Sequence, residues 1–287
     1  MVVATSAPPR VVPLGRWRLL AELGCWAGLT MVVLLPLASL LAVSFETAYG
    51  VPLRAATATL ANYRYILFHD AAAGRAAINS LFLAGSAALL LPALALPLGL
   101  FIAWRGSRLM RFAGLLAELP YALPGVVLAI ACILVFIRPL PILGVSLYNT
   151  IWIMLVAYLA RFLTLALRTV TAGYRQLDRV MEEAAQMAGA GFLRRLEGIL
   201  APLLAPSAIA GAILVFLTAL NELTLSILLW SSGHETLGIV VFSLEQGGDN
   251  LSAAALAVLT VAATIALMLL AGRLARRLPR GALPWQV

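Results

Sequence analysis

The chain alternates long apolar runs with shorter polar connections. Each run is about the length that an α-helix needs to cross ~30 Å of hydrocarbon at about 1.5 Å per residue. In lipid, every backbone polar group must be paired within its segment, so these runs are expected to be helices. The pattern predicts an all-α polytopic membrane protein with six transmembrane helices, at residues 24–43, 78–104, 112–137, 151–167, 203–230 and 253–272.

Composition excludes most other classes of protein. Hydrophobic residues make up 63% of the 287 residues and charged residues 11%, whereas soluble domains are ~45–50% apolar and ~25% charged. A soluble enzyme, a secreted disulfide scaffold and a disordered chain are therefore excluded. The two cysteines, Cys25 and Cys132, lie in apolar runs and are expected to be buried thiols.

All 20 basic residues are arginines. A phosphate-binding Walker loop requires lysine, so the chain is not expected to be a conventional ATPase itself. The net charge of +8 is compatible with a nucleic-acid-binding protein. The arginines, however, lie at the ends of apolar runs and form no basic stripe with interleaved aromatic residues, so no nucleic-acid partner is expected.

The distribution of arginines predicts the orientation in the membrane. Alternate connections carry 15 arginines on one side and 4 on the other, with Arg161 left inside a span. The positive-inside rule then places both termini in the cytoplasm. We expect a cytoplasmic arm at residues 1–23, a six-span domain at 24–272 and a cytoplasmic tail at 273–287.

The connection before the fifth span is patterned like a short helix followed by a corner. Asp178 is positioned to cap a helix, and the carboxylates of the first turns suit the helix dipole. Val180, Ala184 and Met187 recur at helical spacing, and Gly189 can turn the chain sharply. An exposed helix of this kind is a natural docking element for a soluble partner, whereas a plain linker needs no such pattern.

The same residues resemble the "EAA loop" of ABC importer permeases. That pattern is E-A-A, three residues, G, nine residues, I, one residue, L-P. The chain matches it at Glu183-Ala184-Ala185, Gly189, Ile199 and Pro202, and it departs at Ala201, where the family usually has leucine. The resemblance implies a coupling loop at about 178–202 that contacts an ATP-hydrolysing subunit. The candidate coupling residues are Glu182, Glu183, Ala184, Ala185, Gly189 and Arg194.

Two further stretches are similar to the ferric-iron, polyamine and phosphonate group of these permeases. Residues 118–125 read ELPYALPG, and residues 221–249 contain NELT, ETL and GGD, most like the ferric-iron branch. The resemblance implies a type I ABC importer fold in a bacterial inner membrane. It also implies two ATP-binding subunits that hold ATP and magnesium, a second permease subunit that is either the same or a different chain, and an extracytoplasmic solute-binding protein. Ferric iron is the first expectation for the cargo, and phosphonates, polyamines and other small ions are alternatives.

Charged and polar residues inside the spans are candidate pathway or pairing residues. A charge in the membrane costs several kcal/mol unless it is paired or faces water, at about 2.5–3.5 kcal/mol on insertion scales. We expect Arg161 to pair with Glu222 or Glu118, and we include Asn221 in the same set. Pro120 and Pro124 predict either a packing kink or a broken helix that lines a pathway.

Two other functions remain as alternatives. A secondary transporter could be coupled to protons through Glu118 or Glu222, although the EAA-like pattern argues against it. An intramembrane enzyme would need a nucleophile and a base close together, and the two histidines lie in outward connections. His69 and His234 also lack the spacing of metal ligands, so no metal site and no cofactor are expected in the chain.

Overall fold

The computed structural model describes residues 15–51, 53–105, 108–141 and 144–275. Within these ranges the chain forms helices and contains no strand. Long helices form the bundle, namely α1 (Arg18–Ser44), α3 (Ala71–Leu100), α6 (Ile151–Gln176), α9 (Ala201–Leu220) and α12 (Asn250–Ala275). Shorter segments are η1 (Gly15–Trp17), α2 (Ala61–Phe68), η2 (Phe101–Arg105), α4 (Arg108–Ala122), α5 (Gly125–Phe136), α7 (Val180–Met187), α8 (Phe192–Arg195), η3 (Leu196–Leu200), α10 (Ser226–Leu229) and α11 (Leu237–Gln246).

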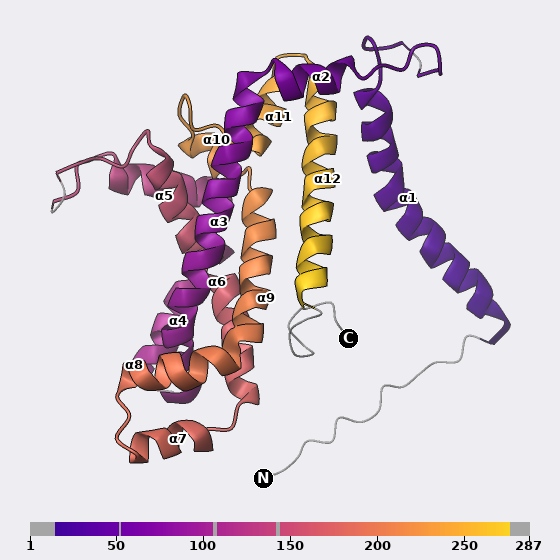
Figure 1. Cartoon of the computed structure of the whole chain (residues 1–287). Helices are drawn as coiled ribbons and strands as arrows, with labels where there is room; N and C mark the ends of the chain where they lie inside the picture. The colour runs from indigo at the N-terminus through magenta and orange to yellow at the C-terminus, as the bar shows by residue number, and fades with distance from the viewer. Residues whose placement is uncertain (1–14, 52, 106–107, 142–143, 276–287) are drawn as a thin grey trace.

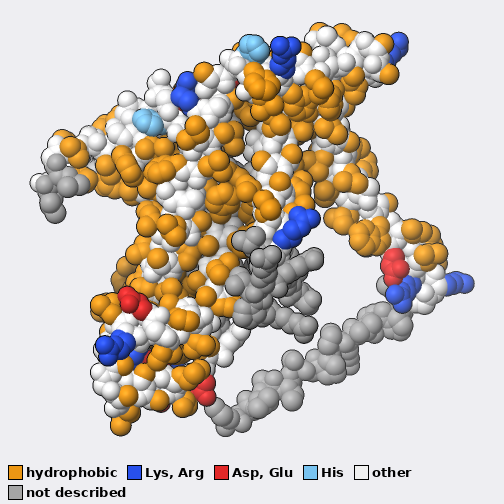
Figure 2. All heavy atoms as spheres, viewed as in Figure 1, with side chains coloured by type: hydrophobic (Ala, Val, Ile, Leu, Met, Phe, Trp, Pro, Cys, Tyr) orange, Lys and Arg blue, Asp and Glu red, His pale blue; other side chains and the backbone are white. Residues whose placement is uncertain are grey.

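The all-α membrane architecture is confirmed. Among the described residues, five helical segments are long and apolar enough to cross a membrane, and the bent pair α4–α5 makes a sixth if it counts as one span. Charged side chains gather toward the ends of the molecule, with apolar side chains between them (Figure 2). Helix α3 begins before the predicted apolar run because a polar residue caps it outside the hydrocarbon. Asp70 accepts a hydrogen bond from the amide of Ala72 at the start of this helix.

Helices α3, α6 and α9 pack together as the core (Figure 1). Tyr158 and Phe162 of α6 are buried there. Two glycines allow close approach in this core. A Cβ atom on Gly173 would lie 2.4 Å from Ser207 Oγ, and one on Gly211 would lie 2.4 Å from Thr169 Oγ1. The hydrophobic effect does not drive helices together inside a membrane, so association depends on van der Waals packing. Small residues at the contacts allow this close packing.

Helix α1 stands at the edge of this bundle. It contacts α12 near one end and diverges from it toward the other (Figure 1). Its only buried residue is Ser44, whose hydroxyl bonds with that of Tyr63 at 2.6 Å. The prediction that both cysteines are buried is wrong for Cys25, because α1 leaves it on the protein surface, whereas Cys132 is buried.

The third predicted span is not one continuous helix. Helices α4 and α5 meet at an angle of 108° with the break at Leu123 and Pro124. Proline lacks an amide hydrogen and disfavours helical geometry in the residue before it, so the chain bends here. The carbonyl of Leu123 accepts a hydrogen bond from Arg161 Nη1 at 3.3 Å. The chain is therefore broken at the two prolines, and a role of this break in lining a pathway stays a prediction.

The fifth predicted span begins and ends earlier than expected, because the helical segment that can cross the membrane is Phe192–Leu220. Helix α9 ends at Leu220 rather than at residue 230, and a separate turn of helix, α10, follows. The reason is the Glu222 carboxylate, which accepts hydrogen bonds from the Leu225 amide at 3.0 Å and from the Thr224 hydroxyl. Short-range bonds of this type compete with the helical ladder.

Candidate functional site

Helix α7 lies with α8 at the end of the bundle opposite α2 and α11 (Figure 1). The start of α1 and the end of α12 lie toward the same end. Asp178 Oδ1 accepts a hydrogen bond from the Val180 amide at 3.1 Å, which satisfies one of the free amides of the first turn. None of the eight residues of α7 is buried. The predicted apolar stripe faces outward, with Val180 62% and Met187 89% exposed.

Gly189 ends α7 in a left-handed turn. Its φ angle is +79°, a conformation that costs about 1–2 kcal/mol in residues with a Cβ atom. The amide of Gly189 bonds to the Gln186 carbonyl, and the amide of Ala190 bonds to the Ala185 carbonyl, each at 3.0 Å. This pair of bonds is the Schellman ending of a helix. The chain thereby reverses into α8 within a few residues.

An ion pair attaches α7 to α8. Arg195 Nη1 donates to Glu182 Oε1, and both side chains are largely buried, at 8% and 13% exposure. Arg195 Nε has no hydrogen-bond partner among the described residues. Sequence reasoning singled out Arg194 rather than Arg195, yet Arg194 is exposed and has no ion pair in the described structure. Glu182 faces inward to this pair, while Glu183 and Ala184 remain exposed.

Aromatic residues fix the segment that leads into α7. Trp104 Nε1 donates to the Tyr174 carbonyl at 3.0 Å, and the Tyr174 hydroxyl donates to the Leu96 carbonyl at 2.9 Å. The two rings meet edge to face, with centroids 5.1 Å apart. The guanidinium of Arg179 lies 5.7 Å from the centre of the Trp104 ring. These contacts join the C-terminal end of α6 to η2. This end of α6 directly precedes α7 in the chain.

A second charged pair lies at the break between α4 and α5. Arg161 Nε is 3.6 Å from Glu222 Oε2, with side chains 18% and 9% exposed. The same guanidinium bonds the Leu123 carbonyl, so α6 contacts both the break and the end of α9. Of the two partners that the sequence allowed for Arg161, the structure places Glu222 beside it. Nearby, the hydroxyls of Tyr158 and Ser226 bond at 2.7 Å.

Glu118 has a different partner. Its Oε2 atom lies 3.4 Å from Arg168 Nη2, and both side chains are about half exposed or more. This pair lines a cavity of about 660 Å³ between α4, η2 and α6. Asn221 is exposed and donates to the Leu217 carbonyl at 2.9 Å, so its side chain caps the C-terminal end of α9.

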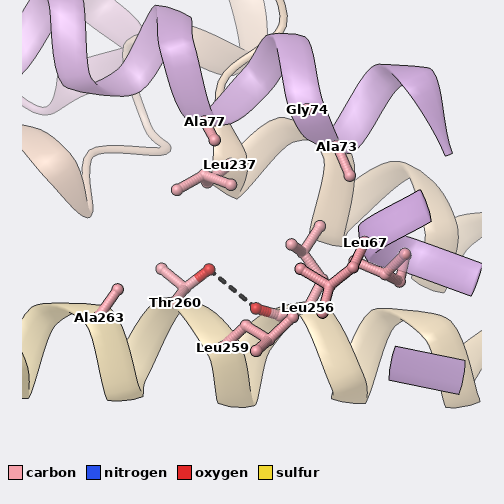
Figure 3. A pocket seen from close by; sticks show the side chains of 10 residues that line it. Leu67, Ala73, Gly74, Ala77, Leu237, Leu256, Leu259, Thr260 and Ala263 are labelled. Atoms are coloured by element: carbon pink, nitrogen blue, oxygen red, sulfur yellow. Dashed lines mark hydrogen bonds between the residues drawn. The ribbon is translucent and has the colours of Figure 1, made fainter. Parts of the chain in front are cut away.

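A further cavity, of about 310 Å³, carries no charge. It lies between α2, α3, α11 and α12, and alanine, glycine and leucine side chains line it (Figure 3). Its one hydroxyl, that of Thr260, already donates to the Leu256 carbonyl at 2.9 Å. Such a surface suits hydrocarbon rather than a polar solute. Among the described residues, no group of three or more His, Cys, Asp or Glu side chains is placed to hold a metal ion.

At the opposite end from α7, the loop before α11 is bound to α3. Asn79 Nδ2 donates to the Gly233 and Glu235 carbonyls at 3.1 and 2.9 Å. Burial alone would raise the pKa of Glu235, but hydrogen bonds from the Gly233 amide and its own amide, together with the Arg75 guanidinium, outweigh burial and hold that pKa below its ordinary value. Sequence reasoning did not single out this contact.

The attachment of this loop is expected to depend on pH. Because the pKa of Glu235 is lower in the folded protein, its contribution is complete above the ordinary carboxyl pKa and is lost as pH falls through the folded value. The contribution should stay below ~1 kcal/mol, since Arg75 is half exposed. Thermal unfolding of detergent-solubilised protein between pH 7 and 3 measures it. Glu235→Gln should remove this increment and flatten the profile, and an unchanged profile would contradict the assignment.

Comparison with known proteins agrees with this architecture. Residues 95–282 match the family model described as binding-protein-dependent transport system inner membrane component. A permease named for 2-aminoethylphosphonate transport from Salmonella paratyphi A is 28% identical over 60% of this chain and 64% of its own length. A permease named for ferric-iron transport from Haemophilus influenzae is 32% identical over 62% of this chain and 34% of its own length. The chain therefore spans less than two thirds of these relatives.

Other relatives and solved structures point the same way. An ABC transporter permease from Streptomyces antibioticus, described as putative, is 31% identical over 75% of this chain and 92% of its own length. A bacterial ABC transporter that imports alginate has a chain with a TM-score of 0.72 at 17% identity, covering 91% of this chain and 96% of that one. A chain of the MetNI methionine transporter has a TM-score of 0.57 at 16% identity, covering 72% and 96%. The chain belongs to the family of inner membrane permease components of binding-protein-dependent ABC importers.

Proposed function

We propose that this chain forms the solute pathway of an ATP-driven importer together with a second permease subunit, and that α7 couples it to ATPase subunits that bind ATP and magnesium. The chain itself would hydrolyse no ATP. An extracytoplasmic binding protein would deliver the solute. Both termini and α7 would lie in the cytoplasm, in agreement with the arginine distribution. The start of α1, the end of α12 and α7 lie toward one end of the bundle, which also supports this orientation.

The observation that carries this proposal is the exposure of α7. A helix whose apolar side chains Val180 and Met187 face outward, while Glu182 is held inward, presents a ready surface for a partner. Glu183 and Ala184 of the EAA-like pattern lie on the exposed side. Closure of the ATPases would move α7, and the rigid turn at Gly189 would pass that motion to α8 and α9.

The cargo belongs to the range that the relatives' names span. Those names mention ferric iron, 2-aminoethylphosphonate and putrescine. Proton-coupled transport through Glu118 or Glu222 is the second candidate function, because each carboxylate is paired with an arginine that its protonation would release. Uptake into ATP-free vesicles driven by a pH gradient would support that second candidate.

Ala184→Trp tests the docking surface. Its indole would project from the exposed side of α7 without touching the bundle, so the permease should fold normally. We expect the variant to lose the ATPase on affinity purification from native membranes and to lose ATP-driven uptake. The matched control is Leu193→Trp, an exposed residue of α8 outside the pattern. Retention of the ATPase by Ala184→Trp, with normal uptake, would contradict docking at α7.

A further inference from the structure

Helix α6 carries three arginines at intervals of seven residues, Arg161, Arg168 and Arg175. Seven residues are close to two helical turns, so the three side chains share one face of α6 and follow one another at intervals of about 10 Å. The series begins at the break between α4 and α5 and ends near the base of α6, the end closest to α7. The three side chains are therefore spaced from the middle of α6 to its end.

The arginines become more exposed along the series, and the last one has no counter-charge among the described residues. Arg161 is beside Glu222 and only 18% exposed, whereas Arg168 is beside Glu118 and 62% exposed. Arg175 is exposed, and it has no ion pair or hydrogen bond to any described residue. The positive charge of the arginines is thus less compensated by carboxylates toward the end of the bundle that holds α7.

The last two arginines open into one cavity. The space of about 660 Å³ is lined by Arg168, Arg175, Thr171 and Glu118, among mostly apolar neighbours from η2 and α4. Two guanidinium groups and one carboxylate leave this cavity with a net positive charge. The apolar cavity of Figure 3 has no such groups and offers a polar solute nothing to bind.

Orientation in the membrane alone does not explain this series. The positive-inside rule accounts for arginines at the ends of spans, such as Arg175, but not for Arg161 inside α6. A guanidinium within a span is costly against hydrocarbon, so the face of α6 that carries Arg161 must meet water or protein. The regular spacing puts all three arginines on that face.

We propose that this face of α6 is a track for anions, and that the imported solute is a small oxyanion such as a phosphonate or phosphate ester. This inference rests on the proposed import function and narrows its substrate class. Guanidinium groups bind such oxygens through two parallel N–H bonds, and Glu118 holds Arg168 until the solute replaces it. A polyamine would be repelled here, and iron would have to pass as an anionic complex.

The charge of the cavity can be measured with thiol reagents. Ala172 lies between Arg168 and Arg175 on α6, lines the cavity and is exposed. In a background carrying Cys25→Ser and Cys132→Ala, Ala172→Cys provides one reactive thiol. The probes are a negatively charged sulfonatoethyl methanethiosulfonate and a positively charged trimethylammonioethyl methanethiosulfonate, applied to the full transporter in nanodiscs. We expect the anionic reagent to react faster, relative to the rates of the two reagents with a free thiol in solution.

Arg175→Gln should lower this anion-to-cation ratio by about five-fold, from removal of one charge roughly 7 Å away in a solvated cavity. Arg64→Gln on α2 is the matched control and should leave the ratio unchanged. A ratio of reaction rates that favours the cationic reagent, or that does not change in Arg175→Gln, would contradict the proposed anion track.

The two proposals fail in different ways. ATP-driven uptake of putrescine, together with a ratio insensitive to Arg175→Gln, would overturn the anion track and leave ATP-driven import standing. A ratio that responds as expected, in a preparation that binds no ATPase, would overturn ATP-driven import and leave the anion site standing. ATP-driven uptake of 2-aminoethylphosphonate that falls in Arg175→Gln but not in Arg64→Gln supports both.

Discussion

Arg161→Glu is expected to abolish the folded permease, and the double variant Arg161→Glu, Glu222→Arg is expected to restore it in part. The single reversal places two carboxylates together where side chains are 18% and 9% exposed. It also removes the donor to the Leu123 carbonyl at the helix break. Loss of one partner of a buried pair costs about 3–5 kcal/mol, a large part of the ~5–15 kcal/mol that stabilises a typical fold.

The measurement is the yield of monodisperse protein on size-exclusion chromatography after detergent extraction. Arg168→Glu is the matched control, because it reverses the more exposed pair with Glu118. An exposed pair is worth less than about 1 kcal/mol, so this variant should extract almost normally. If the double variant is no better folded than Arg161→Glu alone, the pair does not hold α6 to the end of α9.

Arg195→Met is expected to detach α7 from the bundle and to reduce ATP-driven uptake by roughly ten-fold or more. It leaves Glu182 charged and largely buried without its partner. A penalty of about 3–5 kcal/mol for the unpaired charge exceeds the ~1.4 kcal/mol that changes a population ten-fold. The double variant Arg195→Met, Glu182→Leu replaces both charges by apolar side chains and should recover most of the attachment.

Limited digestion by trypsin after Arg179 measures the attachment, alongside uptake. Cleavage should be faster in Arg195→Met and slower again in the double variant. Arg194→Met removes the exposed neighbouring guanidinium and should leave the digestion rate unchanged. Equal digestion rates of Arg194→Met and Arg195→Met would contradict the attachment of α7 by the Arg195–Glu182 ion pair.

Hydropathy could locate the spans because lipid imposes the same local requirement on every segment. The backbone groups must be hydrogen-bonded within the segment, and its side chains must be apolar. The spacing from Glu183 to Pro202 located α7 for a similar reason: each of its features acts over a few residues. Asp178 and Gly189, for instance, act on the adjacent turns only. Features that depend on local chemistry could therefore be predicted from the sequence.

Features that depend on tertiary contacts could not. The sequence left Arg161 with two possible partners, and only packing shows that Arg168 takes Glu118. Likewise, the pattern of α7 gave no sign that Arg195, rather than Arg194, reaches back to Glu182. The early end of α9 follows from the Glu222 carboxylate binding its own backbone, which hydropathy does not register.

The most direct test of coupling through α7 is purification of the tagged chain from its native membrane in mild detergent, with mass spectrometry of the proteins that accompany it. The expected result is an ATPase subunit together with an extracytoplasmic binding protein, and the ATPase should be absent when Ala184→Trp is purified in parallel. A preparation that contains no ATPase, even after crosslinking in the membrane, would contradict ATP-driven import and favour proton-coupled transport.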